Sequence, residues 1–157
     1  LISLKKEIDF ICNYLEIMKL RFPEKLDIQL SFDETLGKLK IPPMLLQPLV
    51  ENSIKYGFVN RSQLFHLTLS ARTEDGAAVL SVEDSGKGFP EEFRGTFDQN
   101  HTFEVPDNPE SDNHVGLRNI YQRLLMYYGE DASLKIDWNG EWSRVGIKIR
   151  DWEKYAL

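Results

Sequence analysis

The sequence has little of what several specialised protein classes require. Its 157 residues contain one cysteine, Cys12, so neither an internal disulfide nor a multi-cysteine zinc site can form. No run approaches the ~20 apolar residues that span a bilayer, and no charged leader followed by an apolar stretch opens the chain. We therefore expect a soluble piece that works in a reducing compartment such as the cytoplasm.

Glycine, proline and basic residues are also modest in number. With 10 Gly, 7 Pro, 41% hydrophobic and 28% charged residues, the composition is that of an ordinary folded domain and excludes a collagenous or wholly disordered chain. The net charge of −6 disfavours attraction to a nucleic-acid backbone, because that attraction rests on clustered cations. We therefore expect no direct nucleic-acid partner, although a local anion site can still exist.

Hydrophobic periodicity and turn residues predict the order of the elements. They are a helix over Leu4–Phe22, a strand over Leu26–Phe32, a helix over Pro43–Tyr56, strands over Leu64–Arg72 and Ala78–Asp84, a helix over Leu117–Tyr128, and strands over Ser133–Trp138 and Arg144–Arg150. Asp75-Gly76 makes the middle strands an antiparallel hairpin, and Gly95 to His114 reads as a long loop. The order predicts an α+β fold: a two-layer sandwich of helices over a mixed, mostly antiparallel sheet.

The first helix leaves two alternatives open. Its apolar residues recur at alternating steps of four and three from Leu4 to Phe22, which is the narrow seam of a coiled-coil-like helix. The seam can lie on the core of its own domain, or it can continue a helical bundle from an upstream segment. Because the chain begins at Leu1 rather than at Met, we expect residues 1–22 to continue from a missing upstream segment.

Three short motifs follow in order, and each alone has an ordinary explanation. On the second helix, Glu51, Asn52 and Lys55 share a polar sector, which by itself is typical of a solvated face. Asp84-Ser85-Gly86-Lys87-Gly88 directly follows an apolar strand. An Asp there can accept a hydrogen bond from an exocyclic amine such as that of adenine, and the two glycines let the backbone approach a ligand closely.

The third motif is Gly116-Leu117-Arg118-Asn119, which we place at the start of the third helix. Free backbone N–H groups and the helix dipole favour an anion at such a position, and Arg118 or Arg123 can add positive charge. A glycine hinge that ends the preceding loop is the simpler explanation. The order of all three motifs, each at a structural junction, favours a phosphate-bearing ligand.

Together these motifs resemble the ATP-binding domains shared by sensor histidine kinases, DNA gyrase, the Hsp90 chaperone and MutL, which have the Bergerat-type fold. Residues Leu46 to Gly57 are similar to the N box, Asp84 to Gly88 to the first glycine box, and Gly116 to Leu124 to the second. The match is closest to LytS-like sensor histidine kinases, and Tyr14 to Phe22 also resembles the stretch after their phosphoacceptor segment. The resemblance covers nearly the whole chain.

The resemblance implies roles for individual residues. At the base end of an ATP site, Asp84 takes the adenine amino group, while Gly86 and Gly88 shape the pocket. At the phosphate end, Asn52 holds the Mg²⁺ and Lys55 lies near the phosphates.

The second glycine box completes this implied site. Gly116 admits the phosphates and hinges a lid over residues 95–115, and the contacts extend to Leu117 and Arg118. The resemblance also implies that residues 1–22 continue from a dimerisation and phosphoacceptor segment and that residues 23–157 form the ATP-binding domain.

Some residues depart from the family pattern. His114 stands where a glycine usually opens the second glycine box, and Trp142-Ser143 replaces a late Gly-Thr pair. Pro48 occupies the position where ATP-hydrolysing relatives place a general-base Glu, and a proline cannot accept a proton. This favours phosphoryl transfer to a histidine over hydrolysis. His66 reads as a surface residue on a strand, and His101 and His114 lie in the predicted lid, so we expect the acceptor histidine upstream.

The resemblance therefore predicts the catalytic domain of a two-component sensor histidine kinase that uses ATP and Mg²⁺. Its partners are a phosphoacceptor segment of the same or a partner subunit and a response regulator, in a homodimer whose parent is anchored in the bacterial cytoplasmic membrane. The alternative is a degenerate, non-catalytic module that acts in dimerisation or protein interaction. A serine kinase similar to anti-sigma factors is a third, less favoured reading.

Overall fold

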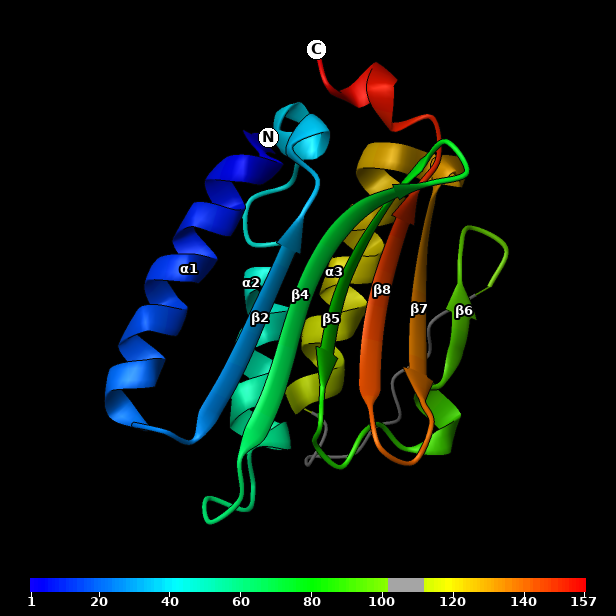
Figure 1. Cartoon of the computed structure of the whole chain (residues 1–157). Coiled ribbons are helices and arrows are strands. Elements are labelled where there is room, and N and C mark those ends of the chain that lie inside the picture. The colour runs from blue at the N-terminus through cyan, green and yellow to red at the C-terminus, as the bar shows by residue number, and fades with distance from the viewer. Residues whose placement is uncertain (102–111) are drawn as a thin grey trace.

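A computed structural model of the chain describes residues 1–101 and 112–157, with only the backbone described for 112–115. Six strands form one sheet in the order β2-β4-β5-β8-β7-β6 (Figure 1). In that spatial order they are Leu26–Phe32, Phe65–Glu74, Ala77–Asp84, Ser143–Ile149, Ala132–Trp138 and Gly95–Phe97. β2 and β4 are parallel, and every other neighbouring pair is antiparallel.

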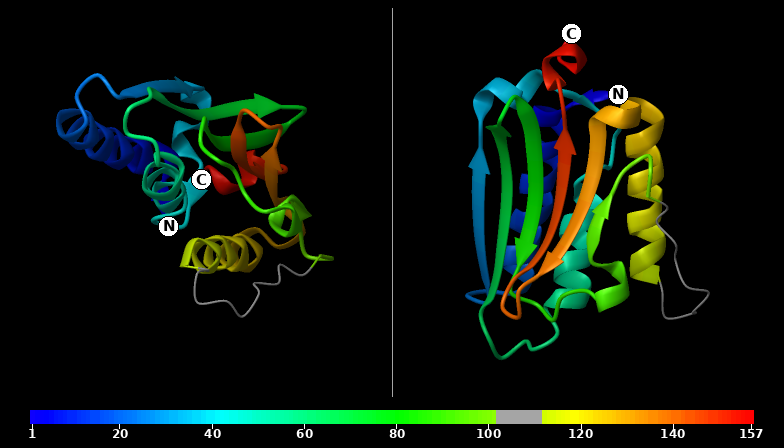
Figure 2. Two further views of the ribbon diagram at one scale, coloured as in Figure 1. Left: turned by 90° about the horizontal axis from the view of Figure 1, so that it is seen from below. Right: turned by 90° about the vertical axis from the view of Figure 1, so that its right-hand side faces the viewer.

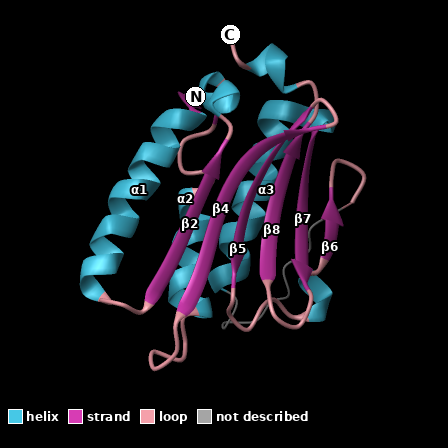
Figure 3. Cartoon of the chain, in the orientation of Figure 1, coloured by secondary structure: helices cyan, strands magenta, loops and turns pink. Residues whose placement is uncertain are grey.

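Three helices cover one face of this sheet, and the other face is open (Figure 2). They are α1 (Leu4–Arg21), α2 (Gln47–Asn52), which continues as a π-helix over Ser53–Gly57, and α3 (Asp112–Tyr128). A two-stranded ladder of β1 (Ile2–Ser3) and β3 (Lys40–Ile41) lies beside the start of α1. Short 3₁₀ helices occupy Glu34–Lys38, Glu91–Phe93, Gly129–Asp131 and Trp152–Tyr155 (Figure 3).

The core lies between the two layers because the strands alternate. In β4, Phe65, Leu67 and Leu69 are buried while the residues between them are half-buried, as expected for a strand with one covered face. The same core contains residues from α1, α2 and α3. The predicted α+β two-layer sandwich with a mixed, mostly antiparallel sheet is therefore confirmed, as are the Leu26–Phe32 strand and the hairpin through Asp75-Gly76.

The seam of α1 packs on the core of its own domain. Leu4, Ile8, Ile11 and Leu15 are all at most 5% exposed. That residues 1–22 also continue from an upstream segment stays a prediction. The opposite side of the helix carries Phe10, Ile17 and Leu20 at 47%, 60% and 82% exposure. No helix in residues 1–101 and 112–157 is long and apolar enough to cross a membrane.

The second helix begins at Gln47, four residues after the predicted start at Pro43. Met44 has a left-handed backbone with φ of 59°, which a continuous helix from Pro43 would not allow. The helix is capped instead by Glu7 of α1, whose Oε1 accepts hydrogen bonds from the backbone N–H groups of Leu46 (2.6 Å) and Gln47 (3.2 Å). Glu7 is 1% exposed, so a buried carboxylate from one helix fixes the start of another.

The predicted loop Gly95–His114 is shorter than expected at both ends. Gly95–Phe97 form β6, which pairs with β7, and α3 begins at Asp112 rather than near Gly116. Gly116 therefore lies inside the helix, and the prediction that it opens the helix with free N–H groups is wrong. The residues between, 102–111, lie outside the described part, as do the side chains of 112–115, including His114.

Candidate functional site

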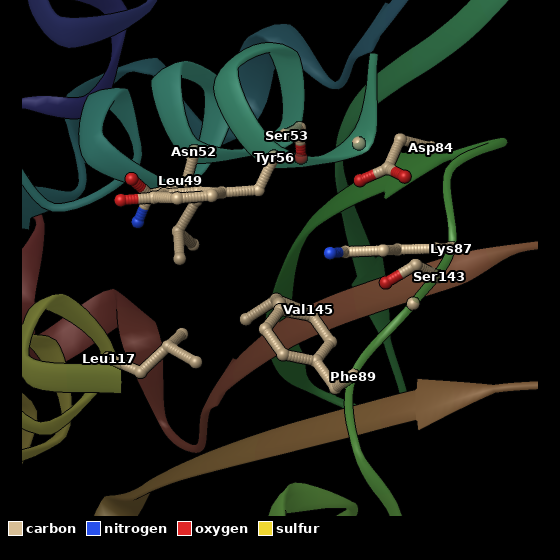
Figure 4. Close-up of a pocket in the computed structure, with 12 residues that line it drawn as sticks. Leu49, Asn52, Ser53, Tyr56, Asp84, Lys87, Phe89, Leu117, Ser143 and Val145 are labelled. Atoms are coloured by element: carbon tan, nitrogen blue, oxygen red, sulfur yellow. The ribbon is translucent and has the colours of Figure 1, made fainter. Parts of the chain in front are cut away.

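A small cavity lies between the helix layer and the lower end of the sheet in Figure 1, and Figure 4 shows it in close-up. Three separate segments line it: α2 with its π-helix, the loop after β5, and α3, with the start of β8 as a floor. The lining residues are Leu49, Asn52, Ser53, Tyr56, Gly57, Asp84, Lys87, Gly88, Phe89, Leu117, Ser143 and Val145. All three motifs singled out in the sequence thus contribute to one cavity.

Asp84 ends β5 at one side of this cavity. Its carboxylate Oδ1 accepts a hydrogen bond from the Gly86 backbone N–H at 2.8 Å, and the residue is 7% exposed. Burial raises the pKa of the Asp84 carboxyl above its ordinary value, while hydrogen bonds from the Ser53 side chain and the Gly86 N–H oppose that rise. A carboxylate can accept about four hydrogen bonds, so Asp84 can accept a further donor from a ligand.

Two glycines bring the N-box segment against the loop after β5. A Cβ built on Gly86 would lie 2.5 Å from Gly57 Cα, and one built on Gly57 would lie 3.0 Å from Asp84 Oδ1 and 3.1 Å from Phe65. Gly86 has no room for a side chain, because real Cβ atoms do not approach backbone this closely, and a side chain at Gly57 would force Asp84 or Phe65 to shift. The end of the π-helix is therefore held directly on the Asp84 turn, and π-helical turns frequently occur at functional sites.

Asn52 lies at the other side of the cavity, where α2 faces α3. A Cβ on Gly116 would come 3.4 Å from Asn52 Nδ2, so the glycine lets the third helix pack close to this amide. Leu117 is 1% exposed and lines the cavity next to it. Asn52 and Asp84 thus mark opposite ends of the same space (Figure 4).

The cations near the site differ from the expectation. Lys55 is exposed, with its Nζ 5.0 Å from the centroid of the Tyr56 ring, and it does not line the cavity. Arg118 is also exposed, and Arg123 donates to the backbone carbonyls of Pro43 and Met44. The lysine that does line the cavity is Lys87, whose side chain extends into it in Figure 4.

Sequence reasoning missed several cavity residues besides Lys87. Three of them are Ser53, Tyr56 and Phe89, which lie next to predicted motif residues in the sequence. Closeness to a motif was the only sequence signal that could have found them. Ser143, the hydroxyl of the late Trp142-Ser143 pair, is buried and lines the floor beside Asp84. The strand register explains this, because Ser143 of β8 pairs with Asp84 of β5.

The cavity has a volume of about 40 Å³. Within the described ranges, no group of three or more His, Cys, Asp or Glu side chains is placed to hold a metal ion. The polar side chains that line it are one amide, one carboxylate, three hydroxyls and one lysine ammonium, a set suited to orienting a polar ligand.

Comparisons with known proteins identify relatives of the chain. No protein-family model matches the chain. It is 35% identical over 136 residues to the sensor protein LytS of Oceanobacillus iheyensis and 31% identical over 136 residues to that of Bacillus subtilis. Each match covers 87% of this chain but only 23% and 22% of those proteins, so the chain spans less than a quarter of their length.

Solved structures show the same fold. The catalytic domain of the histidine kinase ThkA has a TM-score of 0.66 at 15% identity, over 98% of this chain and 96% of that one. The histidine kinase domain of a blue-light-activated kinase from Erythrobacter litoralis has a TM-score of 0.62 at 20% identity, over 99% and 68%. The chain therefore belongs to the LytS-like sensor histidine kinases, as a segment with the fold of their ATP-binding catalytic domain.

Proposed function

We propose that this chain is the ATP-binding catalytic domain of a sensor histidine kinase and that it transfers the γ-phosphoryl group of ATP to a histidine. The observation that carries the proposal is that Asp84, Asn52 and Leu117 line one cavity, with Gly116 packed beside the Asn52 amide. They come from segments 32 residues or more apart in the sequence, in a chain related to sensor histidine kinases.

At the base end, Asp84 accepts a hydrogen bond from the adenine amino group. Its carboxylate is buried and already anchored by the Gly86 N–H, so its direction is fixed before a ligand arrives. Gly86 and Gly88 keep the loop backbone free of side chains at the point where the base enters.

At the phosphate end, Asn52 supplies the protein ligand for Mg²⁺. Mg²⁺ keeps several waters and phosphate oxygens in its shell, so a single neutral amide oxygen fits it without a carboxylate cage. When bound, the ion would offset the negative charge of the phosphates. Gly116 keeps the space beside the Asn52 amide open, and Leu117 closes its apolar side.

The cations contribute by charge rather than by contact in the present arrangement. Lys55 and Arg118 lie outside the cavity on exposed surfaces, from which their long side chains can reach phosphates that project outward. The lid expected over residues 95–115 falls mostly outside the described residues, which include β6 at its start.

The reaction is transfer rather than hydrolysis. A histidine ring nitrogen attacks the γ-phosphorus, the bond to the β–γ bridging oxygen breaks, and ADP leaves. Pro48 lies on α2 four residues before Asn52 and offers no group that could take a proton from water. A neutral histidine nitrogen already carries its lone pair and needs no such base.

The acceptor histidine is supplied from upstream of Leu1, in the same or a partner subunit. His66 lies on the open sheet face with its Nδ1 2.8 Å from Asp27 Oδ2, and His101 Nδ1 is 2.7 Å from Asp98 Oδ1. Neither lines the cavity. In the full-length protein, a homodimer anchored in the cytoplasmic membrane would pass the phosphoryl group on to an aspartate of a response regulator.

Calorimetric titration of Mg-ATP or Mg-ADP tests the proposal. We expect micromolar binding that is lost in Asp84→Ala and Asn52→Ala and kept in Asp75→Ala, a matched change in the turn before the same strand. The chain alone should take no label from γ-labelled ATP, whereas a version extended upstream should take it. Wild-type protein that binds no nucleotide would instead favour the non-catalytic interaction module.

A further inference from the structure

The cavity floor continues one strand beyond Ser143 to a residue with no assigned role. Strand register places Asp84 opposite Ser143, and Ser143 opposite Trp138 at the end of β7. The three residues thus form a row across β5, β8 and β7. The chain leaving β5 crosses the end of β8 in this row before it reaches β6, which pairs with β7 on its far side.

That crossing segment rests on the Trp138 indole. Gly88 has φ of +74°, and a Cβ built on it would lie 2.5 Å from Trp138 Cγ and 2.6 Å from Cδ1. The Gly88 backbone therefore lies flat against the ring, at a distance that excludes every other residue. Gly88 also lines the cavity, so one face of this peptide segment meets the site and another meets the indole.

Arg94 holds the same segment from a second direction. Its guanidinium carbon lies 4.7 Å from the centroid of the Trp138 ring, within the range of a cation–π contact. Its Nε donates a hydrogen bond to the Phe89 carbonyl at 2.9 Å, and the Phe89 side chain lines the cavity. The Trp138 ring and the Arg94 guanidinium together hold Gly88 and Phe89, two residues that line the cavity.

The indole acts here through its flat surface. Trp138 Nε1 is buried and has no hydrogen-bond partner in the part of the chain that the structure describes. A buried N–H without a partner contributes nothing favourable, so the ring is needed for its shape and not for its donor.

We propose that Trp138, assisted by Arg94, is a positioning residue for the base-binding loop: it supports Gly88 and Phe89 from behind and so sets their distance from Asp84. This inference rests on the proposed nucleotide-binding function. Without the ring, the Gly86–Phe89 segment loses its support, and the wall that faces the base is displaced from the fixed Asp84 carboxylate.

Binding of Mg-ADP and Mg-GDP to folded variants tests this role. We expect Trp138→Leu to weaken ADP binding about tenfold, because small displacements of positioned groups cost affinity on this scale. Its ADP-to-GDP affinity ratio should fall as well, which simple loss of stability would not cause. Trp138→Phe keeps a flat ring and should restore both values to within about threefold of wild type. The matched control is Trp142→Leu on the same hairpin, whose ring lies 6.0 Å from that of His66 and does not contact Gly88.

Fluorescence gives an independent readout. In a Trp142→Phe, Trp152→Phe background, Trp138 is the only tryptophan, and its emission should change as ADP saturates the site. If wild type binds no nucleotide, the proposed function fails, and this inference with it. If wild type binds but Trp138→Leu matches it in affinity and base ratio, or Trp138→Phe fails to rescue, only the positioning role is overturned.

Discussion

Two aspartates at strand ends make the same local turn in opposite surroundings. Asp33 follows β2, and its Oδ1 accepts the backbone N–H of Thr35 at 2.9 Å; Asp84 ends β5, and its Oδ1 accepts the N–H of Gly86 at 2.8 Å. Hydrogen bonds from Thr35 hold the pKa of Asp33 below its ordinary value, whereas burial raises the pKa of Asp84. Local sequence chemistry makes the turn, and only tertiary packing makes one of them a candidate site.

The packing that distinguishes them comes from distant segments. Asp84 lies beneath Gly57 and beside Phe65, while Asp33 is bonded to Thr35 and to the Thr73 hydroxyl at the surface. A buried, fixed carboxylate next to a cavity discriminates between ligands, because an analogue without the matching donor leaves it unpaired. An exposed one is always solvated and discriminates little.

Replacing the two carboxylates should break this comparison most strongly. Asp84→Asn should weaken Mg-ADP binding about 100-fold, because the amide loses a charge-assisted hydrogen bond to the base. Asp33→Asn should leave the affinity unchanged, since that residue lies at the opposite end of the sheet. Calorimetry on both variants measures the difference, and equal affinities would show that Asp84 does not contact the ligand.

The glycines at the two ends of β5 sharpen the comparison. Gly86→Ala places a Cβ 2.5 Å from Gly57 Cα and should cost about 2 kcal/mol in the free energy of unfolding. In Gly76→Ala, in the turn before β5, the new Cβ meets nothing within 4 Å. Only the unfavourable φ of +75° lowers the free energy of unfolding, by about 1 kcal/mol. Urea unfolding of both variants provides the measurement. A smaller loss for Gly86→Ala than for Gly76→Ala would contradict the close contact.

The two pKa shifts predict opposite pH dependences of stability. Because the folded-state pKa of Asp84 is raised, its contribution is present below pH about 3.8 and is lost as the pH rises through the raised value. Because that of Asp33 is lowered, its contribution is present above pH about 3.8 and is lost as the pH falls through the lowered value.

Unfolding measurements from pH 3 to 7 on wild type and both Asn variants check these signs. At neutral pH, Asp84→Asn should stabilise the ligand-free fold and Asp33→Asn should weaken it. A stability loss in Asp84→Asn at neutral pH would mean that the carboxylate is not strained by burial.

The smallest expected effect separates two lysines. Lys87→Gln should weaken Mg-ADP binding about threefold and leave adenosine binding unchanged, because an exposed cation adds only modest attraction to phosphates. Lys55→Gln, at a lysine that lies outside the cavity, should weaken Mg-ADP binding less than Lys87→Gln does. A larger loss for Lys55 would mean that its side chain turns inward when nucleotide binds.

Much of the fold could be predicted from the sequence because strand alternation and turn residues are local signals. β2 and the hairpin through Asp75-Gly76 follow from such patterns. The start of α2 could not, because it depends on Met44 and on Glu7, a carboxylate 39 residues from the N–H it caps. β6 was not predicted, because a strand of three residues is too short to show an alternation of apolar and polar residues.

The candidate site was predictable to the level of motifs and no further. Asp84, Asn52 and the Gly116-Leu117 pair were singled out by their order and junctions; Asp84, Asn52 and Leu117 line one cavity, and Gly116 lies beside Asn52. Two features depend on the side-chain directions and strand register that bring separate segments together. One is that Lys87, and not Lys55, lines the cavity, and the other is that Gly88 packs on Trp138. No local pattern contains that information.

The most direct test follows the amide resonances of ¹⁵N-labelled protein as Mg-ADP is added. We expect saturable shifts at Asn52–Gly57, Asp84–Phe89 and Leu117, and none at Thr35 or Gly76. A spectrum that does not change at millimolar Mg-ADP, or shifts confined to the Thr35 and Gly76 end of the sheet, would contradict nucleotide binding at this cavity.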